Sequence, residues 1–283
     1  MHVNNVSSND EYKKQIRYLK RYNTLSLIVT LCFGILLFLF LVYLFTNQFS
    51  SFWAYYVLGI LAALCAIIMN FLLSLKPFLA LTTPLNDECD PHKFIALNQA
   101  INRRPHPLPL VYSLGYFFLG HFESSAMYAE QVSKSNSPFF LRYKWSILIY
   151  KASSEYMQGD FSTARHTIRN FEDFFHNSTP KVQEKNKNIH LFLLLLQAIM
   201  DLDIEKINEY RNVYQHSIRS FPKLTAAWLT YLLGIAAYYV NDYETAFQYF
   251  SSLMQGYEKT FLAQAASEYI EKIKPLLFVA ETR

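Results

Sequence analysis

Two long apolar stretches, separated by a short polar connection, dominate the first quarter of the chain. Residues 24–45 and 52–75 contain no charged side chain. Each stretch exceeds the ~20 helical residues that are needed to cross ~30 Å of hydrocarbon. We therefore predict two membrane-spanning helices that form a hairpin within residues 24–76.

The charges that flank these stretches predict the orientation of the hairpin. A basic arm over residues 1–23 precedes the first stretch, Lys76 follows the second, and residues 47–51 between them carry no charge. The positive-inside rule then places both termini in the cytoplasm and makes this a multi-pass protein of the cell membrane. Specific lipid recognition by the arm is an alternative to this simple role in topology. The arm residues expected to face lipid headgroups are Lys13, Lys14, Arg17, Lys20 and Arg21.

Small residues in both apolar stretches favour a close approach of the two helices. Gly34 in the first stretch and Gly59 and Ala63 in the second lie at similar depth in an antiparallel hairpin. Small residues allow helix backbones to pack closely in lipid, although they are common in any spanning helix. We predict a helix contact at these three residues.

The chain changes character after the hairpin. Prolines and threonines mark residues 77–107 as a linker, which contains one juxtamembrane helix because Asp90-Pro91 supplies an N-cap and a first-turn proline. We expect this helix to end near Asn102. Residues 108–283 then form the main cytoplasmic domain.

A short pattern recurs in this domain. It consists of a turn residue, a small polar residue, an aromatic residue, two variable positions and a small residue. It occurs at Gly120–Ala126, one residue out of step, and at Gly159–Ala164 and Asn241–Ala246. The spacings of 39 and 82 residues predict a further copy near Met200, where the match is weaker. Each copy lies between two helical stretches and is expected to join them.

These segments resemble the inter-helix turn of the tetratricopeptide repeat, in which Gly or Asn, Asp, an aromatic residue and Ala join two antiparallel helices. The last copy is the most similar, because Leu233-Gly234 and Phe250 match the Leu-Gly and the bulky position of that family. The period near 40 instead of 34 residues and the missing final proline depart from the family. The resemblance covers residues 108–257.

The resemblance implies an all-α fold, in which an α-solenoid of about four helical hairpins follows the transmembrane hairpin. A small residue inside each second helix lets the paired helices approach closely, and the aromatic residue covers the end of the pair. Residues 259–274 are expected to form a closing helix that ends at Pro275. The residues expected to pack at the repeat turns are Phe122, Ala126, Gly159, Phe161, Ala164, Gly234, Tyr243, Ala246 and Phe250.

Composition and charge narrow the class of protein. Hydrophobic residues make up 52% of the chain and charged residues 17%, below the ~25% charged residues of an ordinary soluble domain. The net charge of +4 arises before residue 77, so the main domain is neutral and no nucleic-acid partner is expected. The 3 cysteines form no CxxC pair, which argues against a disulfide scaffold or a zinc site.

No catalytic or phosphate-binding motif occurs, and Asp201, Asp203 and Glu205 fit helix capping better than a metal site. We therefore predict no enzyme activity, no cofactor and no metal. The leading hypothesis is a membrane-anchored scaffold or adaptor whose repeat binds another protein or peptide, with membrane lipid and a second copy of the chain as further partners. The alternatives are a membrane-tethered receptor or regulator that binds a peptide or small ligand in the repeat groove, and a membrane-bound enzyme with an unrecognised site.

Overall fold

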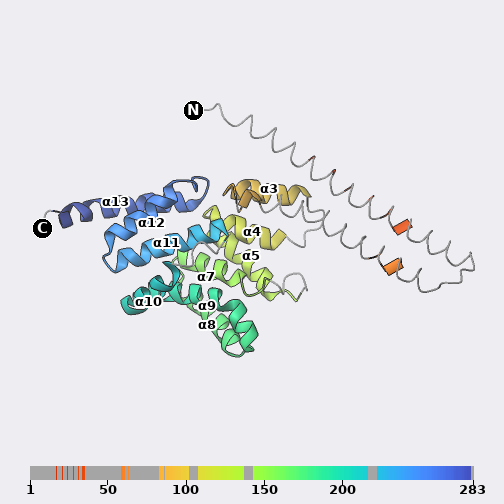
Figure 1. Cartoon of the computed structure of the whole chain (residues 1–283), viewed down its shortest axis with the longest axis horizontal. Helices are drawn as coiled ribbons and strands as arrows, with labels where there is room; N and C mark the ends of the chain where they lie inside the picture. The colour runs from red at the N-terminus through yellow and green to blue at the C-terminus, as the bar shows by residue number, and fades with distance from the viewer. Residues whose placement is uncertain are drawn as a thin grey trace, which may run out of the picture. The chain divides into compact units, whose positions relative to one another are not determined.

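The structure is a computed structural model of the whole chain (Figure 1). It divides into two compact units, Met1–Thr83 and Pro84–Arg283. The residues described below are 83–85, 87–101, 108–136, 143–215 and 222–281, together with Arg17, Arg21, Thr24, Ile28, Leu31, Gly34, Ile35, Gly59, Ile60 and Ala63.

The first unit contains the predicted hairpin, most of which lies outside the described residues. Gly34, Gly59 and Ala63 are helical, but the residues around them are not described, so their contact stays a prediction. In the basic arm Arg17 and Arg21 are helical and exposed, and the three lysines lie outside the described residues. Among the helices described, none has both the length and the apolarity to cross a membrane.

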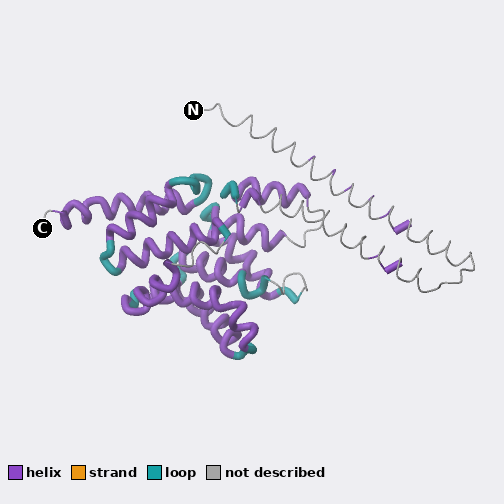
Figure 2. The backbone as a smooth tube through the Cα atoms, in the orientation of Figure 1, coloured by secondary structure: helices purple, strands orange, loops and turns teal. Residues whose placement is uncertain are grey.

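The second unit is all helical and has no strand among its described residues (Figure 2), as predicted. Its helices are α3 (Pro91–Ile101), α4 (Leu108–Phe118), α5 (Phe122–Lys134), α7 (Ile147–Met157), α8 (Phe161–His176), α9 (Pro180–Asp201), α10 (Ile204–Gln215), α11 (Lys223–Tyr239), α12 (Tyr243–Met254) and α13 (Phe261–Glu281).

Four turns with one backbone geometry join α4 to α5, α7 to α8, α9 to α10 and α11 to α12. In the second of them Gly159 donates its N–H to the carbonyl of Tyr156 at 2.9 Å, and Asp160 donates to Glu155 at 3.0 Å. The same two bonds recur in the other three turns. This Schellman arrangement pairs the last carbonyls of the first helix and requires one residue with a left-handed backbone. The left-handed residues are Gly120, Gly159, Leu202 and Asn241, at φ of 78°, 77°, 52° and 61°.

The turn geometry corrects two predicted copies of the pattern. In the first copy the buried small residue is Ser125, which is 0% exposed, whereas Ala126 is only half-buried. The separation between the left-handed residue and the buried small residue is therefore the same in this copy as in the others. In the third copy the left-handed residue is Leu202, two residues after the expected start at Met200, and the buried position holds the larger Ile207. The backbone turn, not the side-chain type, keeps the copies in register.

Helix α3 belongs to the second unit and not to a linker as the sequence indicated. The Asp90 carboxylate accepts the N–H of Lys93 at 2.9 Å and caps the helix. Phe94 then joins the main hydrophobic core, together with Leu85 and Cys89 from the segment before the helix. Burial of these apolar side chains makes the segment part of the packed unit, which local prolines could not reveal.

Helix α13 continues through Pro275 and does not end there as predicted. A proline inside a helix removes one backbone hydrogen bond and usually bends the helix. Pro275 lies among exposed residues, so water can reach the carbonyl of Glu271 that loses its N–H partner. The cost of the missing bond is therefore reduced at this place.

Helices that are distant in the sequence meet in the core of the second unit (Figure 1). The ring centroid of Phe117 on α4 lies 5.0 Å from that of Trp228 on α11 and 5.5 Å from that of Phe261 on α13. Lys259, just before α13, pairs with Asp90, just before α3, at 2.6 Å. Side chains from the beginning and the end of the second unit therefore contact one another.

Candidate binding site

A pocket of about 400 Å³ lies between α5, α7 and α8. Pockets that hold small ligands have volumes of roughly 300–1,000 Å³, so this one can accept a small molecule or one short segment of a chain. The lining residues are Glu130, Ser133, Lys134, Lys144, Trp145, Leu148, Lys151, His166, Thr167 and Asn170.

Helical spacing brings the charged residues of the site together. Glu130 and Lys134 lie one turn apart on α5, and Lys151 and Glu155 lie one turn apart on α7. Residues four apart share one helix face. Since α5 packs against α7, the two faces meet and Lys151 reaches Glu130.

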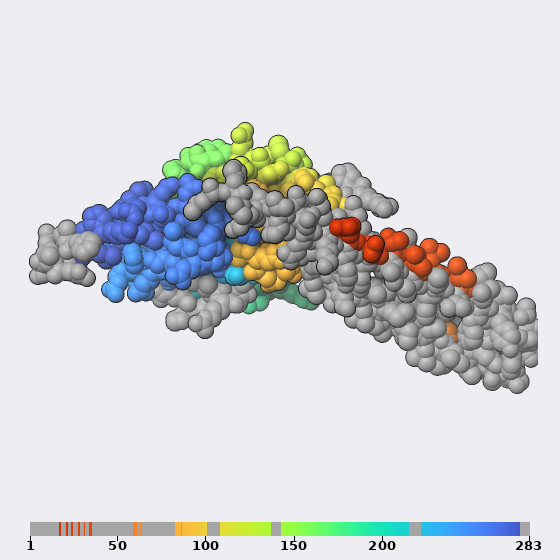
Figure 3. All heavy atoms as spheres, turned by 90° about the horizontal axis from the view of Figure 1, so that it is seen from above, coloured from red at the N-terminus to blue at the C-terminus, as the bar shows by residue number. Residues whose placement is uncertain are grey.

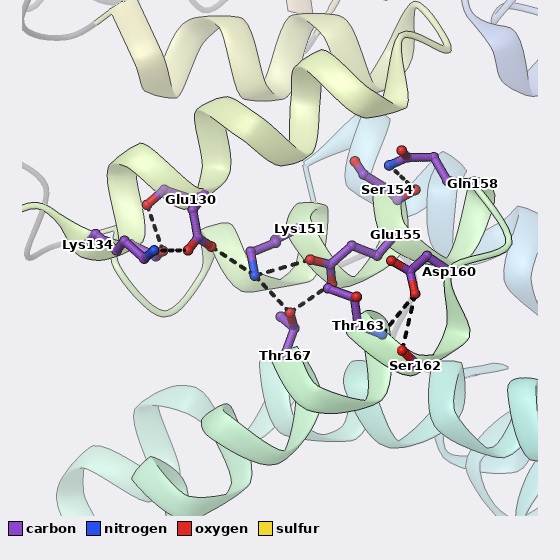
Figure 4. Close-up of polar contacts among 11 residues, drawn as sticks. Glu130, Lys134, Lys151, Ser154, Glu155, Gln158, Asp160, Ser162, Thr163 and Thr167 are labelled. Carbon is purple, nitrogen blue, oxygen red and sulfur yellow. Dashed lines mark hydrogen bonds and ion pairs between the residues drawn. The ribbon is translucent and has the colours of Figure 1, made fainter.

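The side chains form a continuous chain of alternating charge (Figure 4). The Lys134 ammonium lies 2.6 Å from the Glu130 carboxylate. The Lys151 ammonium lies 2.9 Å from Glu130 and 3.1 Å from Glu155. Lys151 also donates to the Thr167 hydroxyl at 3.0 Å, and this hydroxyl donates to Glu155 at 2.7 Å. Each of these four charged side chains therefore has a partner of opposite charge.

Burial and ion pairing have opposing effects on the pKa values of Glu155, Lys151 and Glu130, and the balance differs among the three. Burial raises the pKa of Glu155, which is 5% exposed, and outweighs the hydrogen bond from Thr167 and the charge of Lys151. Burial disfavours the charged form of Lys151, but Glu130 and Glu155 outweigh it and raise the lysine pKa. At Glu130 burial is outweighed by the hydrogen bonds from Lys134 and Lys151, which lower its pKa. Lys151 therefore stays protonated at neutral pH.

The lining carries more positive than negative charge. It contains three lysines and one glutamate, in a part of the chain that is neutral overall. The Lys144 ammonium lies 5.3 Å from the ring centroid of Trp145, within cation–π range. The Trp145 ring stacks on Phe174 with centroids 3.5 Å apart, which holds it in place. Because Lys134 and Lys151 are paired with glutamates, the pocket offers the Lys144 ammonium and an apolar wall to an anionic group.

The residues expected at the repeat turns lie elsewhere and serve packing. Ala164, Ala246 and Phe250 are fully buried, and a Cβ on Gly234 would lie 2.8 Å from the Phe250 ring. Gly159 provides the left-handed backbone of its turn. Phe122 and Tyr243 are half-buried at the starts of α5 and α12. Phe161 departs from its expected covering role, because 42% of its surface is exposed.

Sequence reasoning missed the pocket because its residues come from three helices and form no motif. One signal was present. Glu155 is a charged residue within a run of buried α7 positions that includes Ala152, Ser153 and Ser154. A charge in such a run needs a partner, and Lys151, one turn earlier, was the candidate.

Two of the three acidic residues singled out in the sequence have structural roles. Asp203 accepts the N–H of Lys206 at 3.2 Å and caps α10, and Asp201 pairs with Arg165 at 2.8 Å. Within the described ranges no group of three His, Cys, Asp or Glu residues is placed to hold a metal ion. Searches of the chain against protein-family models, curated proteins and solved structures gave no match. Function is therefore inferred from the chemistry of the pocket.

Proposed function

We propose that this protein is a membrane-anchored helical-repeat adaptor that binds an acidic segment of a partner protein in the pocket between α5, α7 and α8. The Lys144 ammonium beside Trp145, which forms no ion pair with a carboxylate among the described residues, carries the proposal. Ammonium groups form charge-assisted hydrogen bonds with carboxylates. The Trp145 ring and Leu148 supply apolar surface for the stem of the bound side chain.

Exposed apolar residues in the first unit support the membrane anchor. Ile28, Leu31 and Ile35 are helical and 53%, 58% and 53% exposed. In Figure 3 the described residues between 17 and 35 lie along the surface of the first unit. Large exposed apolar side chains such as these are unfavourable in water and are covered in lipid. Together with the uncharged ranges 24–45 and 52–75, they support a two-helix hairpin with both termini in the cytoplasm.

The four equivalent turns support the repeat. In each turn a Schellman bond pair is followed by a second helix whose fourth residue is buried: Ser125, Ala164, Ile207 or Ala246. A recurring helix–turn–helix unit of this kind is expected for a member of the tetratricopeptide-like class. Fixing such a unit to a membrane raises the effective concentration of its partner without adding a contact.

Photocrosslinking in intact cells tests the adaptor function. A photoreactive amino acid at Asn170, an exposed lining residue, is expected to capture a protein, whereas the same group at exposed Ser252 on α12 serves as the matched control. Lys144→Glu should abolish the adduct at Asn170, because it reverses a charge that the acidic segment requires. An adduct that survives this change, or appears equally at Ser252, contradicts the proposal.

A receptor for a small anionic ligand is the second candidate, and the limited pocket volume favours it. In that case Asn170 captures no protein. Mass spectrometry of the purified protein then detects a small anion that is lost in the Lys144→Glu variant.

Membrane attachment is tested separately. We expect the full chain to stay in the membrane fraction after alkaline extraction. We also expect residues 108–283 to resist protease added outside sealed cells. Release by alkali, or digestion of this domain from outside, contradicts the anchor or its orientation.

A further inference from the structure

The turn between α9 and α10 holds an apolar residue in an unfavourable backbone conformation. Leu202 has φ 52°, and the equivalent residues of the other three turns are Gly120, Gly159 and Asn241. A left-handed backbone suits Gly and Asn because a larger side chain crowds the following carbonyl. Leu202 is also 56% exposed, so burial of its side chain contributes little free energy to offset the backbone strain. Backbone strain of this kind points to a functional role for the residue and not a structural one.

Two further apolar residues are exposed beside this turn. Ile204 begins α10 and is 45% exposed, and Phe161 holds the equivalent position in α8 and is 42% exposed. Their counterparts in the outer turns are covered. Phe122 and Tyr243 are half-buried, and the Phe122 ring packs on Phe261 of α13 with centroids 5.0 Å apart. Phe161 contacts only Tyr156 of its own hairpin among the ring pairs of the described residues, with centroids 5.8 Å apart. The exposure is thus confined to the two middle turns, whose residues Phe161, Leu202 and Ile204 we name the apolar edge.

The two turns of the apolar edge are joined to each other. Arg165, one helical turn after Phe161, pairs with Asp201, the neighbour of Leu202, at 2.8 Å. Helices α8 and α10 both pack against α9, and the Arg165–Asp201 pair brings the turn before α10 close to the start of α8.

Acidic side chains surround the apolar edge. The two cations beside it are already engaged, Arg165 with Asp201 and Lys206 with Asp203 at 3.1 Å. Asp160 and Glu205 have no cationic partner among the described residues. The rim therefore carries two uncompensated negative charges, which complement a basic partner and repel anionic lipid.

We propose that the apolar edge docks a basic amphipathic helix of a partner protein. Apolar residues of that helix cover Leu202, Ile204 and Phe161, and its Lys or Arg residues face Asp160 and Glu205. This mode of recognition lays the apolar face of a helix on an apolar surface. A second copy of the chain is a poor occupant, because a two-fold contact would set the two acidic rims against each other. The surface is separate from the cationic pocket.

The test uses the full chain in neutral-lipid nanodiscs and a photoreactive 14-residue amphipathic peptide of Leu and Lys. We expect saturable adducts that map to the turns before α8 and α10. Leu202→Asn, which copies the residue of the last turn, should weaken labelling about tenfold, since burial of one leucine is lost. Val213→Ala, at the far end of α10 and 46% exposed in the wild type, is the matched control and should leave labelling unchanged.

Folding is checked in the same variants. The thermal midpoint of Leu202→Asn should equal or exceed that of the wild type, because the substitution relieves the left-handed leucine. Lys144→Glu in the pocket should not alter labelling by the peptide. Equal labelling of Leu202→Asn and wild type overturns the proposal. Equal labelling by a peptide of Leu and Glu also overturns it, as does a change confined to self-association or to vesicle binding.

Discussion

Trp228 on α11 donates its indole N–H to the hydroxyl of Ser153 on α7 across 3.0 Å, and both side chains are fully buried. One turn away, the hydroxyls of Tyr150 and Thr225 lie 3.0 Å apart in the same register. A buried donor without an acceptor costs free energy. These two contacts therefore set the position of the fourth helix pair relative to the second.

Ser153→Ala should lower the free energy of unfolding by about 1–3 kcal/mol, because the Trp228 N–H is left buried without an acceptor. Chemical denaturation of the full chain in detergent, followed by circular dichroism, measures this. Ser252→Ala removes an exposed hydroxyl and should change stability by less than ~0.5 kcal/mol. Equal effects of the two variants would show that the buried bond contributes nothing.

Gly234→Ala should destabilise the protein by about 1–3 kcal/mol through overpacking. The new Cβ would lie 2.8 Å from the Phe250 ring, which is fully buried and stacks on Tyr269 with centroids 4.8 Å apart. The ring therefore has no free space to move into. Adding Phe250→Leu should recover part of the loss that Gly234→Ala causes, and a simple sum of the two single losses contradicts this account.

The second and third turns allow a matched test of backbone strain. Gly159 has φ 77° and no described atom within 4 Å of a built Cβ, so Gly159→Ala changes only the backbone. It should cost about 1 kcal/mol, and Leu202→Gly should recover a similar amount. Thermal unfolding midpoints should shift in opposite directions. Shifts of the same sign would mean that Leu202 is not strained.

Lys151→Met should destabilise the protein by about 3 kcal/mol, because it leaves the nearly buried Glu155 without its cation. The double variant with Glu155→Gln should regain most of this loss, since Gln removes the charge and keeps an acceptor for Thr167. Denaturant midpoints of the three proteins measure both effects. If the double variant is no more stable than Lys151→Met, the unpaired charge is not the cause.

His190 on α9 should make stability depend on pH. Burial, and secondarily the neighbouring His176, lower the pKa of His190 below its ordinary value near 6.5. The unfolded chain then binds a proton at a higher pH than the folded chain does, so stability should fall as pH decreases below about 6.5.

His190→Phe should make the free energy of unfolding less dependent on pH, because it removes the titrating imidazole. Phenylalanine preserves the stacking on Phe175, whose ring centroid lies 4.0 Å from that of His190. Unfolding free energies of wild type and His190→Phe between about pH 5 and 8 are compared. Parallel pH profiles contradict the assignment.

Much of the second unit follows from short-range signals. Asp90-Pro91 predicted the start of α3, and Gly120, Gly159 and Asn241 predicted turns where the left-handed residues lie. The third turn was placed two residues early because Leu202 is an unusual residue for that conformation. Ala126 was chosen over Ser125 because burial depends on the partner helix and not on side-chain type.

The amino-acid sequence by itself determined that the second unit is helical and where three of its four equivalent turns lie. Caps and Schellman bonds connect residues within about five positions, so their signals are local. Only the tertiary structure decided that Phe117, Trp228 and Phe261 meet and that Glu130 reaches Lys151. These contacts depend on the angles and register at which separate helices pack, and no short stretch of sequence encodes them.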